Sequence, residues 1–167
     1  MRRSIWIFLL LVAGCAPITT LQRAEPGNGI GGTVAFTTGP VFWKGKEIGA
    51  PYVNVYWGNG NMELGIISQA GVAVYYKQKV FDHFSVRILG GGPLPWVEGG
   101  IFYDYQDFTF SGRLGAGEIP TLTEEKNRRL VMGFISASYW RDDLGFEASV
   151  LVNEERIEPL MSVGIRF

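Results

Sequence analysis

The sequence predicts an all-β fold, an antiparallel up-and-down β-barrel of about ten strands, with eight strands as the alternative. From Gly31 onward, apolar residues recur at every second position, which is the period of a β-strand with one apolar face. Tight polar turns lead into strands at spacings of 22, 24 and 36 residues. Two of these spacings match a repeated hairpin, and a loop around residues 116–128 lengthens the third. The nearest candidate for a helix, residues 121–129, is short and highly polar. These observations favour repeated β-hairpins over a helical or mixed fold.

Each expected strand is defined by its own alternation. Val53, Val55 and Trp57, for example, alternate with residues of the opposite face. Polar turns at 58–61, 81–83, 106–107 and 141–143 lead into strands that start at Met62, Phe84, Phe108 and Leu144. The ten expected strands are 32–42, 50–57, 62–68, 71–80, 84–90, 97–105, 108–115, 129–140, 144–152 and 157–167.

Composition limits the function classes. The chain has 167 residues, enough for one domain. Its 15 Lys and Arg residues are balanced by 16 Asp and Glu residues, so there is no basic excess to bind nucleic acid, and no nucleic-acid partner is expected. Hydrophobic residues make up 47% of the chain and charged residues 19%, which predicts a folded protein rather than a disordered one.

The first fourteen residues have the three-part structure of a secretory signal. Arg2 and Arg3 precede an apolar run at residues 5–12, and two small residues follow it. The apolar run is shorter than the ~20 residues that a membrane-spanning helix needs. We therefore expect residues 1–14 to be removed as a signal peptide.

The run Val12-Ala13-Gly14-Cys15 resembles the lipobox of bacterial lipoproteins. The resemblance implies that Cys15 becomes the new N-terminus and carries a covalent lipid, and that the lipoprotein-processing machinery is a partner. Ala16 stands where lipoproteins of the inner membrane usually have Asp, so the resemblance implies localisation to the outer membrane, anchored through Cys15. Residues 15–31 are rich in turn formers, and we expect them to be a lipidated tether before a barrel domain at 32–167.

The polar face of the strands indicates what the barrel surrounds. It mixes small residues with acids and bases in balance, which suits a narrow, filled lumen in a membrane barrel. A soluble sandwich, with these residues facing water, is the alternative. The residues predicted to form a polar network in the lumen are Glu63, Lys77, Arg87, Glu98, Asp104, Arg113, Glu147 and Arg166.

The C-terminal strand supplies a second resemblance. Val163, Ile165 and Phe167 alternate with smaller or polar residues, and Phe167 is the last residue. This segment resembles the C-terminal signal of bacterial outer-membrane barrel proteins, which implies that barrel-assembly machinery is a partner. Pro159 departs from the pattern, because proline cannot donate to a sheet ladder and weakens the start of the strand.

Aromatic residues and topology agree with this interpretation. Trp57, Tyr105, Tyr139 and Trp140 lie beside the tight turns, and Trp43 and Trp96 lie near the opposite strand ends, as two interfacial girdles require. If both termini are periplasmic, the strand number must be even, which ten satisfies. The longer segments 43–49, 90–96 and 116–128 then face outward.

Catalysis is not predicted. His83 and Ser85 are spaced as in the outer-membrane lipid A deacylases, which they resemble, but Val86 stands where that family has Asn. No acid can be assigned to orient His83. With one His and one Cys in the chain, no metal site is expected, and no cofactor besides the lipid on Cys15.

The predicted function is therefore that of an outer-membrane-anchored β-barrel lipoprotein with a structural, envelope-complex or narrow-pore role. Outer-membrane lipid and an envelope protein complex are further expected partners. The alternative is a lipid-tethered soluble β-barrel or sandwich that binds a lipid or a protein.

Overall fold

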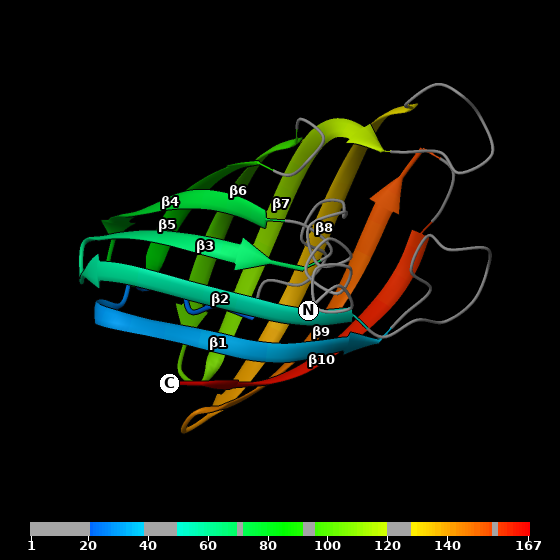
Figure 1. Ribbon diagram of the computed structural model, residues 1–167. Helices are drawn as coiled ribbons and strands as arrows, with labels where there is room; N and C mark the ends of the chain where they lie inside the picture. Colours follow the sequence, from blue (N-terminus) through cyan, green and yellow to red (C-terminus); the bar gives the residue numbers. More distant parts are fainter. Residues whose placement is uncertain (1–20, 39–49, 70–71, 92–95, 120–127, 155–156) are drawn as a thin grey trace, which may run out of the picture.

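The computed structural model describes residues 21–38, 50–69, 72–91, 96–119, 128–154 and 157–167. They form ten β-strands in one closed antiparallel barrel, in which each strand pairs with its neighbours in the chain and β1 pairs with β10 (Figure 1). The strands are β1 (Asn28–Thr38), β2 (Ala50–Asn59), β3 (Met62–Ser68), β4 (Val72–Phe81), β5 (Phe84–Gly91), β6 (Trp96–Tyr105), β7 (Phe108–Ile119), β8 (Arg128–Arg141), β9 (Leu144–Asn153) and β10 (Ile157–Arg166). The predicted up-and-down barrel of ten strands is confirmed. Across these residues there is no helix long and apolar enough to cross a membrane.

The barrel has two different ends. The turns β2–β3, β4–β5, β6–β7 and β8–β9 are short and lie at one end, together with the start of β1 and Phe167 (lower left in Figure 1). We call this the turn end, and the opposite end the loop end. Three of the turns contain a non-glycine residue with positive φ, namely His83, Gln106 and Asp142. The four strands after the short turns begin where the sequence predicted, at Met62, Phe84, Phe108 and Leu144.

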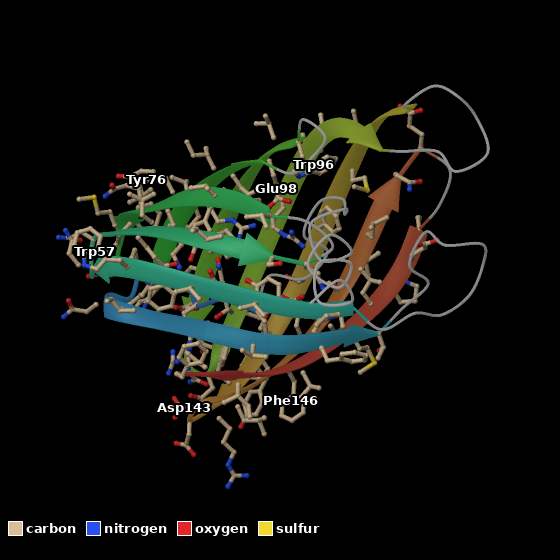
Figure 2. All side chains as sticks on the ribbon, viewed as in Figure 1. Trp57, Tyr76, Trp96, Glu98, Asp143 and Phe146 are labelled. Carbon is tan, nitrogen blue, oxygen red and sulfur yellow. The ribbon has the colours of Figure 1, made fainter. Side chains whose placement is uncertain are left out.

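Side chains alternate between the interior, or lumen, and the outer surface. In β9 and β10, buried and exposed residues alternate almost without interruption. Large apolar side chains lie exposed on the outside of all ten strands, as Phe146 does in Figure 2. The lumen instead contains Ser, Thr, acids, bases and aromatic residues, together with aliphatic residues such as Ile67 and Leu160. The alternation predicted from the sequence therefore separates an apolar outer surface from an interior that mixes polar and apolar side chains.

Inward glycines make room for inward aromatic rings. A Cβ atom on Gly65 would lie 2.4 Å from the ring of Tyr75, one on Gly115 would lie 2.3 Å from Trp96, and one on Gly145 would lie 2.7 Å from Trp140. Since a narrow barrel has little interior space, a large ring on one strand needs a minimal residue opposite it. This explains part of the high glycine content, 23 residues of 167, roughly twice the average usage.

The first strand differs from the expectation. It begins at Asn28 rather than at residue 32, because residues 28–32 already pair with residues 55–59 of β2. Residues 39–42, the expected end of this strand, lie outside the described residues. Residues 21–27, which we expected to belong to a tether together with 28–31, lie inside the barrel, where Leu21 and Ala24 are fully buried.

The aromatic girdles are corrected in part. Trp57, Tyr105 and Tyr139 point outward at the turn end, with 53%, 56% and 37% of their surface exposed. Trp96 and Trp140 are instead buried in the lumen, since they share the parity of their strands' inward residues. Trp43 lies outside the described residues. Within those residues, the outward aromatic side chains are concentrated at the turn end.

Candidate functional site

The lumen brings together most of the predicted network residues, in three groups. The first group lies near the turn end, where Glu63 of β3 meets Lys77 of β4 at 3.0 Å and accepts a hydrogen bond of 2.6 Å from the Tyr75 hydroxyl. Register places Glu63 directly opposite Lys77 on adjacent antiparallel strands, so the pair follows from the fold. Both side chains are 2% exposed, and such a pair is tolerated in the interior because each charge has a partner.

The second group spans the middle of the lumen. Glu98 of β6 accepts from Arg87 of β5 at 2.5 Å and from Arg113 of β7 at 3.3 Å, and all three side chains are inaccessible to solvent. The guanidinium of Arg87 lies 5.0 Å from the Phe102 ring, and that of Arg113 lies 4.2 Å from the Phe134 ring. These cation–π contacts and the shared carboxylate hold two like charges in one interior.

The third group binds residues 21–27, which we call the luminal segment. Asp104 of β6 accepts the main-chain N–H groups of Ala24 at 3.0 Å and Glu25 at 3.1 Å. Glu147 of β9 accepts the N–H of Leu21 at 2.9 Å. The segment crosses the turn-end part of the lumen and hydrogen-bonds to side chains of opposite walls.

The remaining predicted site residues lie elsewhere. Arg166 is partly exposed at the turn end, 3.8 Å from Asp143, and is not joined to the three groups by a contact that the structure describes. Val163, Ile165 and Phe167 are exposed on the outer surface, and their role as an assembly signal stays a prediction. Cys15 lies outside the described residues, so its lipidation also stays a prediction.

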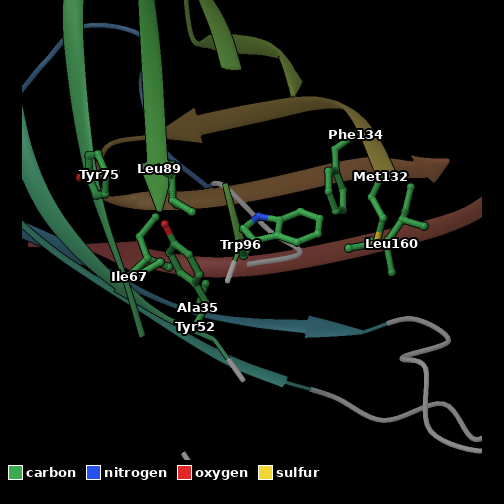
Figure 3. Close-up of a cluster of buried hydrophobic side chains, with 11 residues drawn as sticks. Ala35, Tyr52, Ile67, Tyr75, Leu89, Trp96, Met132, Phe134 and Leu160 are labelled. Carbon is green, nitrogen blue, oxygen red and sulfur yellow. The ribbon is translucent and has the colours of Figure 1, made fainter. Parts of the chain in front are cut away.

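The loop-end part of the lumen is apolar. Tyr52, Ile67, Leu89, Trp96, Met132, Phe134 and Leu160 pack together with four further residues there, as Figure 3 shows. We call this the apolar cluster. Most of it lies on the loop-end side of the group around Glu98. Two members also contact the turn-end part, because the Tyr75 hydroxyl donates to Glu63 and the Tyr52 hydroxyl accepts a hydrogen bond of 3.4 Å from Gln22 of the luminal segment.

A polar cavity of about 330 Å³ remains beside the luminal segment. Its walls come from the segment itself, at Arg23 and Glu25, and from the barrel, at Thr33, Asn54 and Arg166 among others. The cavity is large enough for several water molecules and is lined by groups that hydrogen-bond to water. The turn-end part of the lumen is therefore occupied but not packed like a protein core.

The structure does not support a catalytic pair of His83 and Ser85. His83 lies in the β4–β5 turn with its side chain 62% exposed, and its Nδ1 is 3.5 Å from a Glu25 oxygen. Ser85 is buried in the lumen wall. Among the described residues, no group of three or more His, Cys, Asp or Glu side chains is placed to hold a metal ion.

Several important residues were not predicted. Gln22 is buried and its Oε1 accepts a hydrogen bond of 2.9 Å from Arg87. Thr109 donates to Asp104, and Ser138 donates to Glu147. The inward parity of β7 and β8 could have indicated Thr109 and Ser138, but no periodic signal marks the luminal segment, because it is not part of a strand.

Comparison with known proteins supports the architecture. A solved structure described as "KdgM porin" aligns with this chain at a TM-score of 0.50 and 13% sequence identity, over 82% of this chain and 98% of that one. The two chains share a fold. No protein-family model matches the sequence, and no curated protein shows significant sequence similarity to it. The chemistry of the lumen must therefore be interpreted from its own residues.

Proposed function

We propose that this protein is an outer-membrane β-barrel whose lumen is closed, and that its role is structural, as an anchor or an accessory of an envelope complex. The observation that carries the proposal is the outer surface, where large apolar side chains such as Ile88, Ile101 and Leu114 are more than half exposed on the neighbouring strands β5, β6 and β7. Soluble monomers rarely expose contiguous apolar patches larger than a few hundred Å². An apolar surface around the whole barrel, with charged side chains buried in the interior, is the arrangement of a membrane barrel.

The orientation follows from the two ends. Outer-membrane barrels have short periplasmic turns and longer external loops. The turn end of this barrel carries the short turns and the outward aromatic residues Trp57, Tyr105 and Tyr139, which suit the headgroup region. We therefore assign the turn end to the periplasm. On this assignment, a lipid on Cys15 lies in the periplasmic leaflet, and lipoprotein-processing and barrel-assembly factors are the expected partners.

The filled lumen supports a structural role over conduction. The group Arg87, Glu98 and Arg113 crosses the middle of the barrel without solvent access, and the apolar cluster lies beyond it. A barrel of this size has an interior that its own side chains can fill. No catalytic role is assigned to any residue, and the expectation that the protein is not an enzyme stays a prediction.

A narrow pore is the second candidate, and the fold shared with a solved porin favours it. Conductance of the purified protein in planar bilayers separates the two functions. A closed barrel gives a baseline without steps, whereas a pore gives discrete single-channel steps. Ion-selective steps in the unmodified protein would replace the structural role with the pore.

Membrane insertion itself is tested with the variant Cys15→Ser, exported by a cleavable signal that does not lead to lipidation. We expect this variant to remain in the outer-membrane pellet after alkaline carbonate extraction and to migrate differently on gels before and after heating. Release into the soluble periplasm would instead support the lipid-tethered soluble barrel. The unmodified chain, extracted in parallel, is the control for recovery and folding.

A further inference from the structure

The luminal segment is held through its main chain. The N–H groups of Leu21, Ala24, Glu25 and Gly27 all donate to wall carboxylates, the last of them to Glu63 at 2.7 Å. The carbonyl of Arg23 accepts a hydrogen bond of 3.1 Å from the Nζ of Lys77. The wall thus presents acceptors to peptide N–H groups and a donor to a peptide carbonyl. Hydrogen bonds to charged groups such as these are stronger than neutral ones.

Side chains of the segment are recognised at few positions. Gln22 accepts a hydrogen bond from Arg87 and donates one to the Tyr52 hydroxyl, and Leu21 and Ala24 are fully buried. Glu25 points outward, 48% exposed, toward Lys79 and His83 at the rim. The wall therefore recognises mainly the main chain of a segment that bends at Ala24 and Glu25, and leaves the side chain of Glu25 at the rim.

Most of the contacts that hold the segment are polar. They are hydrogen bonds to charged side chains, and the cavity of about 330 Å³ already lies next to the segment. Leu21, which is fully buried next to Gly145, makes the main apolar contact that is lost on release. Water can replace the segment on Asp104, Glu147 and Glu63, because polar sites of this size hold ordered water. The apolar cluster, which closes the lumen at the loop end, has no member from the segment.

We propose that the turn-end part of the lumen is a peptide-binding site for a short, bent segment, occupied here by residues 21–27 and exchangeable for a similar segment of a partner protein. The partner's segment would supply three or four main-chain N–H groups to the same carboxylates. The proposal depends on the geometry of the lumen and not on membrane insertion, so it can fail or succeed independently of the proposed function.

The test uses the full chain with Leu21→Pro, Ala24→Pro, Glu25→Pro and Gly27→Pro, because proline has no main-chain N–H and the four donors that hold the segment are removed. The probe is a fluorescently labelled synthetic peptide with the sequence of residues 21–27, acetylated and amidated at its ends. We expect saturable binding to this variant by fluorescence anisotropy, and at least tenfold weaker binding to the unmodified chain, whose site is occupied. Absence of binding to the folded variant would overturn the proposal.

Matched controls identify what is recognised. A peptide with N-methyl groups at the positions of Ala24 and Glu25 keeps every side chain but lacks the donors to Asp104, and we expect it to bind at least tenfold more weakly. A peptide with Gln at the position of Glu25 should bind within about twofold of the parent. If N-methylation has no effect, recognition of the main chain is refuted.

A second measurement covers the case in which the replaced chain does not fold. Trypsin cleaves after Arg23, and the neighbouring residues are buried in the lumen. In the unmodified chain we expect protection of this bond, and in Asp104→Asn we expect cleavage at least tenfold faster while the barrel stays resistant. The rim variant Asp143→Asn should match the parent. Cleavage of the folded parent at the rate of the denatured chain would overturn the proposal.

Discussion

In the turn-end half of the lumen, charged side chains meet one another and the luminal segment through directed hydrogen bonds, whereas the loop-end half is filled by apolar side chains in contact. Glu63, Asp104 and Glu147 each hold a main-chain group of the segment. The apolar half is instead stabilised by the hydrophobic effect, as Trp96, Phe134 and Leu160 pack together away from water. The same alternating strands build both halves, so the difference comes only from which residues occupy the inward positions.

The two halves differ in whether the groups that fill them can be replaced by other groups. Directed hydrogen bonds can be made equally well by another peptide or by water, so their net contribution to stability is modest. Water cannot replace a close-packed apolar side chain in this way, because the side chains around the resulting void lose their van der Waals contacts. The polar half is therefore suited to binding and the apolar half to sealing. The group of Arg87, Glu98 and Arg113 marks the boundary between them.

Disrupting the group of Arg87, Glu98 and Arg113 should lower the free energy of unfolding more than the other substitutions considered below. In Glu98→Gln, the two buried guanidinium groups lose the carboxylate between them, and we expect the free energy of unfolding to fall by about 3–5 kcal/mol. Unfolding by denaturant in detergent micelles measures it. Asp143→Asn, at the partly exposed pair with Arg166, should cost less than about 1 kcal/mol. Equal effects of the two variants would mean that the boundary group is not buried as described.

A substitution in the apolar cluster tests whether the two halves of the lumen are independent of each other. Leu160→Ala removes a side chain of the apolar cluster and leaves a cavity, so we expect a loss of about 2–4 kcal/mol. Because Leu160 lies in the apolar cluster and away from the segment, trypsin cleavage after Arg23 should stay as slow as in the parent. Faster cleavage in Leu160→Ala would show that the two halves are coupled.

A smaller effect tests how tightly the apolar half is packed. A Cβ on Gly115 would lie 2.3 Å from the Trp96 ring, so Gly115→Ala should overpack the cluster and cost about 1–3 kcal/mol. Gly99 is the matched control, because a Cβ there meets no atom within 4 Å. Thermal unfolding of the two variants compares them. A Gly115→Ala variant as stable as Gly99→Ala would contradict the packing of Trp96.

The smallest effect belongs to the rim. The hydrogen bond from Lys79 and its charge hold the pKa of the exposed Asp82 below its usual value. A lowered pKa adds stability above the pKa of the unfolded state, and this is lost as pH falls through the lower folded value. Asp82→Asn should therefore match the parent only at pH values below the lowered pKa of Asp82, and differ at most slightly at neutral pH, because the pair with Lys79 is exposed. A large difference at neutral pH would show that the rim pair matters more than its exposure allows.

Most of the barrel could be predicted from the sequence, because alternation fixes both the strands and their inward face. Glu63 and Lys77 were expected in the lumen on this basis, and the structure adds that they are partners, which depends on register across two strands. The position of Trp140 was predicted wrongly, because it was inferred from the residue type and not from its place in the alternation of the strand. Its identity favours an interfacial girdle, but it has the parity of Ser136 and Ser138, which face inward.

The luminal segment could not be predicted, for a physical reason. Residues 21–27 carry no period, and Pro26 and Gly27 are typical of loops anywhere. Their position is decided by carboxylates on three distant strands, and a single sequence gives no sign of that arrangement. The early start of β1 was missed for a similar reason, since residues 28–31 contain turn formers and belong to the strand because β2 pairs with them.

The seam between the first and last strands also governs how the barrel can form. Thr37 and Ser162 hydrogen-bond across it although they are 125 residues apart in the chain. Until β10 is in place, the growing sheet has two open edges, and open edges pair readily with other chains. Folding that waits for such distant contacts is slow. This protein is therefore most prone to aggregation before the barrel closes. A factor that covers the two open edges during that time would prevent aggregation.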